Sequence, residues 1–166
     1  HKTEAGAVAL NAKTADDVGA AYDRITASAK KYKGDAKVQG VLVQAMAEKG
    51  TEVILGIDRD PQFGPMLMLG LGGIHVEVLR DVTFAPVPLG REEAERMIGR
   101  LKGAKLLDAH RGAPAADKAA LADLIVKLAR FAADHADRIQ EIDLNPVIVH
   151  PEGKGATIAD ALIVTR

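Results

Sequence analysis

Apolar residues recur along the chain with two periods, and these predict a mixture of helices and strands. Apolar residues three and four positions apart predict helices over residues 15–32, 91–102 and 117–135. Short apolar or alternating runs predict strands over residues 7–10, 38–46, 52–57, 66–69, 74–79, 82–87, 142–149 and 157–164. Turn-forming residues at 60–65 and 151–155 separate successive strands. Strands, then helices, then a closing hairpin predict an α+β fold with a largely antiparallel sheet and flanking helices.

Composition excludes several classes of function. The 166 residues include no cysteine, so disulfides and thiolate metal sites are impossible. A net charge of -1 and an aromatic content of 3% argue against a nucleic-acid partner. No apolar run reaches the roughly 20 residues of a membrane span, and no signal peptide is visible. We therefore expect a cytoplasmic protein with neither a nucleic-acid nor a membrane partner.

The closing hairpin carries the most informative polar pattern. Glu141, Asp143 and Asn145 alternate onto one face of the first strand. Folding about the turn is expected to bring Asp160 of the second strand close to Asn145. Asp160 has apolar sequence neighbours, and a bound Mg²⁺ would offset the cost of its charge there. Pro146 removes a backbone donor and indicates an edge or a bulge. The alternative is that these acids simply solvate an exposed strand.

A glycine-rich segment spans residues 70–77 and includes Gly72, Gly73 and Glu77. It resembles a dinucleotide-binding fingerprint, but strand-like residues follow the glycines where that motif requires a helix. Backbone N–H groups of such a turn can still face an anion. The other interpretation is a tight hairpin turn.

A third candidate is the apolar run that ends at Gln44, Ala45 and Met46 and is followed by Glu52. An apolar strand that runs into a polar break is where two lobes could hinge. Backbone groups there could read an adenine edge, and the carboxylate could hold ribose hydroxyls. A core strand with an exposed end is the alternative.

Taken in order, these segments resemble the ATP-grasp domain of NDP-forming acyl-CoA synthetases, relatives of the succinyl-CoA synthetase β subunit. The resemblance covers essentially the whole chain. The matching words, by position, are 1–6 (HKTEAG), 43–46 (VQAM), 50–56 (GTEVILG), 60–65 (DPQFGP), 72–77 (GGIHVE), 81–82 (DV), 88–89 (PL), 106–107 (LL), 111–112 (RG), 141–146 (EIDLNP) and 160–161 (DA).

The resemblance implies a role for each candidate residue. Asn145 and Asp160 would be the Mg²⁺ ligands. The nucleotide, ATP/ADP or GTP/GDP, would be held by an adenine-binding hinge and by cleft residues, namely Gln44, Ala45, Met46, Glu52, Gly72 and Gly73. Glu77 would act on the phosphate side of the cleft, and His1 would relay the phosphoryl group. Residues 1–46 would form part of the small ATP-grasp lobe and residues 47–166 the C-terminal lobe.

The family reaction couples acyl-CoA thioester cleavage or formation to NTP formation or hydrolysis through phosphoryl transfer. The resemblance thus implies an acid–CoA ligase whose CoA and main phosphohistidine belong to another domain or subunit, in an oligomer. The chain is expected to be N-terminally truncated and inactive alone, because the lysine that family members carry before the first motif is not in this sequence. The alternative is a ligase-inactive regulatory ATP-grasp module, for example in an acetyltransferase-fused protein.

Overall fold

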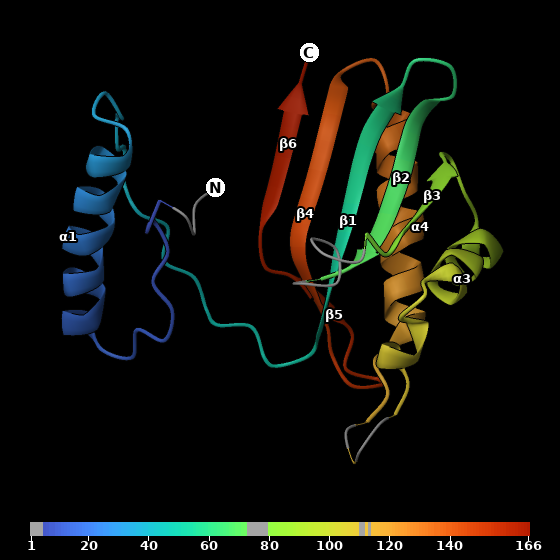
Figure 1. Cartoon of the computed structure of the whole chain (residues 1–166), viewed down its shortest axis with the longest axis horizontal. Coiled ribbons are helices and arrows are strands. Elements are labelled where there is room, and N and C mark those ends of the chain that lie inside the picture. Colours follow the sequence, from blue (N-terminus) through green and yellow to red (C-terminus); the bar gives the residue numbers. More distant parts are fainter. Residues whose placement is uncertain (1–4, 73–79, 110–111, 113) are drawn as a thin grey trace. The chain divides into compact units, whose positions relative to one another are not determined.

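The chain divides into two compact units, His1–Met46 and Ala47–Arg166. The computed structural model describes residues 5–72, 80–109, 112 and 114–166. Figure 1 traces the whole chain, and the two units are described separately below. The division lies where the sequence analysis places the boundary between lobes, while the identity of the units as ATP-grasp lobes stays a prediction.

The first unit is built on one helix, α1 (Ala15–Tyr32), which has the predicted bounds. Thr14 caps its N-terminus, because its side chain accepts a hydrogen bond from the backbone nitrogen of Asp17 at 3.1 Å. The Asp17 carboxylate in turn accepts from the Thr14 nitrogen at 3.0 Å, which completes a capping box. Acidic residues in the first turn and lysines in the last turn match the helix dipole.

The strands predicted over residues 7–10 and 38–46 are wrong, because both segments have neither helix nor strand structure. Leu42 is 83% exposed and Leu10 is 67% exposed. Extended backbone forms a stable strand only when a neighbouring strand satisfies its hydrogen bonds. The structure pairs neither segment with a strand within the part of the chain that it describes, so an apolar pattern alone overpredicts them.

Within the described residues, the second unit contains a six-stranded antiparallel sheet in the order β3-β2-β1-β4-β5, with β6 also paired to β4. The helices that the structure describes in this unit cover one face of the sheet (Figure 1). The strands are β1 (Thr51–Asp60), β2 (Gly64–Leu71), β3 (Val82–Pro86), β4 (Ile139–Val149), β5 (Ala156–Ile158) and β6 (Ala161–Thr165). The helices are α3 (Arg91–Arg100), the short 3₁₀ helix η1 (Ala104–Leu107) and α4 (Lys118–Asp134).

This unit confirms most of the predicted elements and corrects one. The strand expected over residues 157–164 is two strands, β5 and β6, interrupted at Ala159 and Asp160. The interruption faces Pro146 of β4, which has no backbone donor for a regular ladder. The strand predicted over residues 74–79 lies outside the described residues.

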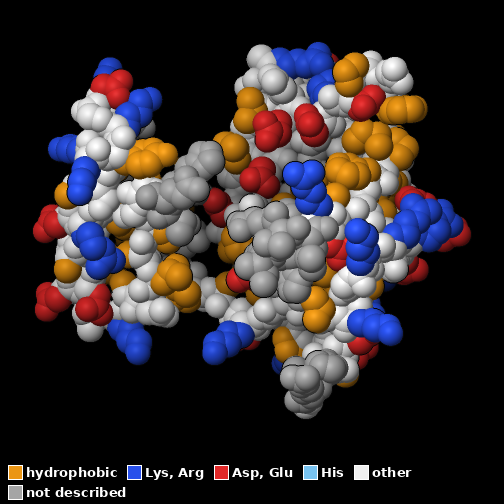
Figure 2. All heavy atoms as spheres, in the orientation of Figure 1, with side chains coloured by type: hydrophobic (Ala, Val, Ile, Leu, Met, Phe, Trp, Pro, Cys, Tyr) orange, Lys and Arg blue, Asp and Glu red, His pale blue; other side chains and the backbone are white. Residues whose placement is uncertain are grey.

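The hydrophobic core lies between the sheet and the helices. Alternate residues of each central strand point into it, for example Val53, Leu55 and Ile57 of β1, which are at most 2% exposed. Leu121 and Ile125 of α4 meet them with no exposed area. The side chains between these core positions therefore project from the opposite face. This face carries no helix among the described residues and is called the helix-free face below. Figure 2 shows acidic side chains gathered on it over β4 and β1.

In the described part of the chain, no helix has both the length and the apolar character that crossing a membrane requires.

Candidate functional site

The site begins with a bulge in the middle of β4. Val53 of β1 pairs with Val147, and Leu55 pairs with Leu144. One residue of β1, Ile54, therefore faces two residues of β4, Asn145 and Pro146. The bulge confirms the prediction made from Pro146, and β4 is a central strand, so the edge alternative does not hold.

On the other side of β4, Asn145 lies opposite Asp160. β5 and β6 pair with β4 in one continuous register. Val147 of β4 pairs with Ile158 of β5, and Leu144 of β4 pairs with Ala161 of β6. The backbone nitrogen of Asn145 donates to the carbonyl oxygen of Asp160 at 3.2 Å, and the nitrogen of Ala159 donates to the carbonyl of Pro146 at 3.0 Å. The predicted proximity of Asn145 and Asp160 is confirmed.

Both side chains belong to the helix-free face. Leu144 is buried on the helix side, so its neighbour Asn145 projects the other way and is exposed. Directly opposed residues of an antiparallel pair share a face, which puts Asp160 on the same side. Asp160 is half-buried, and its Oδ1 accepts a hydrogen bond from the Ala161 nitrogen at 3.0 Å.

The ends of β1 and β2 bring together Glu52 and Gly72. Gly72 lies opposite Glu52 and donates its N–H to the Glu52 carbonyl at 2.7 Å. A Cβ atom on Gly72 would lie 2.7 Å from Glu52 Cβ and 2.8 Å from its carbonyl oxygen, so only glycine fits against this backbone. The Glu52 side chain is exposed on the helix-free face. Ile54, two residues later, is the next residue of β1 on that face, about 7 Å along the strand.

Four predicted residues thus lie on the helix-free face and together are called the row: Gly72, Glu52, Asn145 and Asp160. They form two pairs offset along the strands, because Gly72 lies opposite Glu52 and Asn145 lies opposite Asp160, whereas the β4 residue opposite Glu52 is Ile148. The side-chain ligands of the row are hard oxygen atoms, an amide carbonyl and carboxylates, which suit Mg²⁺ or Ca²⁺ better than softer metals. Among the described residues, no group of three or more His, Cys, Asp or Glu side chains could hold a metal by itself.

The roles of the other predicted site residues stay predictions. Gln44, Ala45 and Met46 are exposed and belong to the first unit, so their relation to the row stays a prediction. His1, Gly73 and Glu77 lie outside the described residues.

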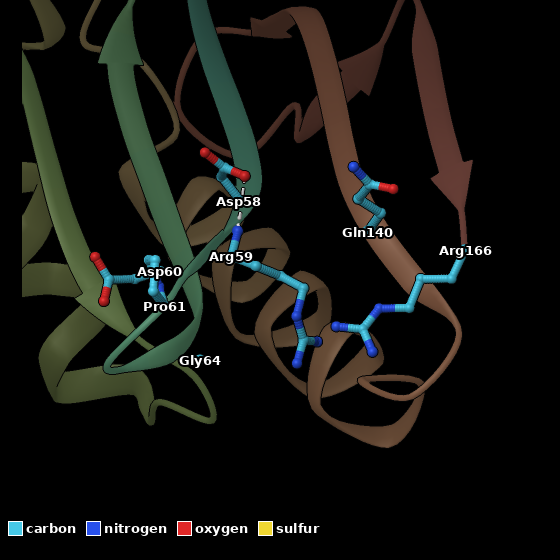
Figure 3. A pocket seen from close by; sticks show the side chains of 7 residues that line it. All are labelled: Asp58, Arg59, Asp60, Pro61, Gly64, Gln140 and Arg166. Atoms are coloured by element: carbon cyan, nitrogen blue, oxygen red, sulfur yellow. Dashed lines mark hydrogen bonds between the residues drawn. The ribbon is translucent and has the colours of Figure 1, made fainter.

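An open depression of about 440 Å³ lies at the other end of the strands, where Arg59 and Arg166 point toward one another (Figure 3). It is lined by Asp58, Arg59, Asp60, Pro61, Gly64, Gln140 and Arg166. Arg59 donates to the carbonyl of Ala136 just beyond α4, and Asp60 accepts from the backbone of the following turn. These contacts give both residues a structural role.

A polar cluster that no sequence signal predicted as a whole is formed by the buried Asp117 and His150 and the exposed Thr157. Asp117 is the N-cap of α4 and is 7% exposed. Hydrogen bonds from the backbone N–H of Ala120, and then of Gly155, lower the pKa of Asp117 from its ordinary value. An aspartate just before an apolar helical run is a recognisable cap signal, but its second bond, to Gly155, has no local signature.

Comparison with known proteins identifies the fold family. The model of the ATP-grasp domain matches residues 1–165. The chain is 42% identical over 166 residues to the β subunit of acetate–CoA ligase (ADP-forming) II of Pyrococcus furiosus, covering all of this chain and 70% of that subunit. It spans 22–24% of several longer curated relatives, which are named as CoA ligases or as a CoA synthase.

Solved structures agree. The dinucleotide-forming acetyl-coenzyme A synthetase 1 of Ca. Korarchaeum cryptofilum, in complex with coenzyme A and Ca-AMPCP, is 41% identical with a TM-score of 0.94 over 99% of this chain and 70% of that one. The same synthetase with coenzyme A and Mg-AMPPCP gives a TM-score of 0.83 at 39% identity, over all of this chain and 71% of that one. The chain therefore belongs to the ATP-grasp family and matches, along its whole length, the β subunits of ADP-forming acetate–CoA ligases.

Proposed function

We propose that this chain binds a nucleotide together with a divalent cation, as the nucleotide-binding part of an ADP-forming acid–CoA ligase. The observation that carries the proposal is the pairing of Asn145, in the β4 bulge, with Asp160 at the junction of β5 and β6, with both side chains on the helix-free face. Further support comes from the related synthetase, which has been solved with Mg-AMPPCP and with Ca-AMPCP.

Two oxygen ligands from the protein fit the coordination of Mg²⁺ at nucleotide sites. That ion typically binds through one or two protein oxygen ligands and completes its shell with phosphate oxygens and water. In this proposal the Asn145 amide and the Asp160 carboxylate hold the ion. When bound, the ion offsets charge on the phosphates during transfer.

The remaining residues of the row orient the nucleotide. Glu52 presents its carboxylate to hydroxyl groups of the ribose, and the absence of a Cβ at Gly72 lets the backbone pack closely against Glu52 and hold it in place. Gln44, Ala45 and Met46 are proposed to contact the adenine, His1 to relay the phosphoryl group and Glu77 to contact the phosphates. We propose further that residues 1–46 are part of the small ATP-grasp lobe and that residues 47–166 are the C-terminal lobe.

Acyl transfer to CoA requires groups that we assign to another domain or subunit, including the CoA site and the main phosphohistidine. The name of the Pyrococcus relative as a β subunit supports a partner of this kind. The cytoplasmic location and the oligomeric state stay predictions. No observation in the described part of the chain favours the ligase-inactive alternative.

Calorimetry on the intact protein tests the proposal. Nucleotide affinity is measured with Mg²⁺ and with a chelator, for the wild type, Asn145→Ala and Asp160→Ala. Loss of either ligand is expected to weaken Mg-dependent binding at least about tenfold, with little effect in chelator. Glu141→Gln is the matched control, because Glu141 is exposed on the same face of β4, four residues before Asn145. Unchanged Mg dependence in both ligand variants would remove the pair from the metal site.

A further inference from the structure

The buried carboxylate of Asp117 forms hydrogen bonds both to the N-terminus of α4 and to the turn between β4 and β5. Asp117 Oδ1 accepts the backbone N–H of Ala120 at 3.0 Å and so caps the helix. Its other oxygen, Oδ2, accepts the N–H of Gly155 at 2.9 Å. Gly155 immediately precedes β5, so Asp117 joins the helix to the start of this strand.

Backbone hydrogen bonds reinforce the same connection. The nitrogen of Asp117 donates to the His150 carbonyl at 2.8 Å, and the nitrogen of Glu152 donates to the Ala115 carbonyl at 2.9 Å. The nitrogen of His150 donates to the Gly155 carbonyl at 3.0 Å and closes the turn on itself.

A second side-chain contact ties β5 to the end of β4. His150 Nε2 lies 2.7 Å from Thr157 Oγ1, and the His150 ring is 7% exposed. A buried ring needs hydrogen-bond partners, and Nδ1 of this ring has none among the described residues. The contact with Thr157 therefore matters for keeping the ring in place.

These contacts constrain the register in which β5 pairs with β4. β5 has only three residues, and a strand this short specifies its register weakly. A slip of one residue would set Asp160 opposite Leu144 or Pro146 instead of Asn145. Asp160 follows Gly155 by five residues, with Thr157 between them, so the two contacts fix the segment that carries it.

We propose that Asp117 and Thr157 are positioning residues that hold β5 in register and thereby place Asp160 opposite Asn145. This inference rests on the proposed function, because it gives Asp160 its importance. A simpler role for Asp117 is to cap α4, for which Oδ1 alone suffices. The bond from Gly155 to Oδ2 lies outside the cap, and it joins the start of β5 to α4.

Two variants separate positioning from capping. Asp117→Ser keeps a hydroxyl that can cap α4 but removes the acceptor for Gly155. Thr157→Val keeps the branched shape suited to a strand but removes the hydroxyl beside His150. Glu152→Gln is the control, since it changes an exposed side chain of the same turn. Should Asp117→Ser fail to fold, Thr157→Val carries the test.

The first readout needs neither metal nor nucleotide. Amide hydrogen exchange is measured at Asn145 and Ala159, whose N–H groups form the two hydrogen bonds across the junction. Both variants are expected to exchange there about tenfold faster than the wild type, while core amides of β1 stay protected. Wild-type exchange at both positions in folded variants would overturn the inference.

The second readout is the ratio of nucleotide affinities with Mg²⁺ and with chelator in the intact protein. The ratio is expected to fall about tenfold in both variants, with the chelator affinity unchanged. A purely structural role would change the two affinities together or neither, and either result would overturn the inference. Asp160→Ala is measured in parallel. If it lowers the ratio and the two variants do not, only the positioning inference fails. If it leaves the ratio unchanged, the proposed metal site fails, and this inference fails with it.

Discussion

The close contact between Gly72 and Glu52 predicts that a single added methyl group, in Gly72→Ala, lowers the stability of the protein. In Gly72→Ala the new Cβ would lie 2.7 Å from Glu52 Cβ and 2.8 Å from the Glu52 carbonyl oxygen. Both distances are more than half an ångström below the 3.4 Å at which ordinary contacts begin. The atoms concerned are backbone or directly attached to it, so no side-chain rotation relieves the clash. The ends of β1 and β2 must therefore move apart.

Gly56 supplies a matched control on the same face of β1. A Cβ there would lie 3.4 Å from Met68 Cε and 3.6 Å from the Ile142 carbonyl, which are ordinary contacts. Overpacking lowers the free energy of unfolding by about 1–3 kcal/mol. Replacing glycine by alanine raises it by about 0.4–1 kcal/mol, because the unfolded chain has less conformational entropy to lose. We therefore expect Gly72→Ala to lower the free energy of unfolding by about 1–2 kcal/mol, and Gly56→Ala to change it by less than about 1 kcal/mol.

Urea denaturation of both variants and the wild type measures this difference, and nucleotide calorimetry measures its consequence for the site. Movement of Glu52 should weaken nucleotide binding in Gly72→Ala and leave it unchanged in Gly56→Ala. Equal unfolding free energies for the two alanine variants would refute this explanation, because they would show that the backbone at Gly72 and Glu52 can move apart without loss of stability.

Three further outcomes are expected. Asp81 is 3% exposed and accepts the backbone N–H groups of Lys102 and Gly103, both at 2.8 Å; Asp81→Ala should therefore lower the unfolding free energy by roughly 1–3 kcal/mol for each N–H left unpaired, and an unchanged urea midpoint would count against these bonds. Leu121→Ala, at a fully buried position of α4, should cost about 2–5 kcal/mol in the same assay, and a cost below 1 kcal/mol would mean that the core is not packed as described. The lowered pKa of Asp117 means that its carboxylate stabilises the folded chain above its ordinary pKa of about 4. This stabilisation is lost as the pH falls through the lowered value. The urea midpoint of Asp117→Asn should therefore fall less than that of the wild type between about pH 7 and about pH 2, and equal falls would contradict the assignment.

The sequence predicted those parts of the fold whose signals are local. α1 has its predicted bounds because Thr14, the acidic first turn and the basic last turn mark both ends. Alternation along residues 141–145 placed Asn145 on the helix-free face, and Pro146 indicated the bulge. The closing hairpin then brought Asp160 opposite Asn145, as its turn predicted.

The parts that the sequence did not predict depend on contacts between distant segments. Leu42 and Val43 lie in an apolar run typical of a strand, but a strand also requires a partner, and the run does not reveal whether one exists. The bond from Gly155 to Asp117 joins residues 38 positions apart, and the break between β5 and β6 depends on Pro146 of the neighbouring strand. No periodicity encodes either contact.

Binding of Mn²⁺, a paramagnetic substitute for Mg²⁺, tests the central claim most directly. Electron paramagnetic resonance counts the Mn²⁺ bound to the intact protein in the presence of ADP, for the wild type, the double variant Asn145→Ala/Asp160→Ala and the control Glu141→Gln. The proposed site predicts one nucleotide-dependent Mn²⁺ in the wild type and the control, and its loss in the double variant. An undiminished Mn²⁺ signal in the double variant would show that the ion is held elsewhere.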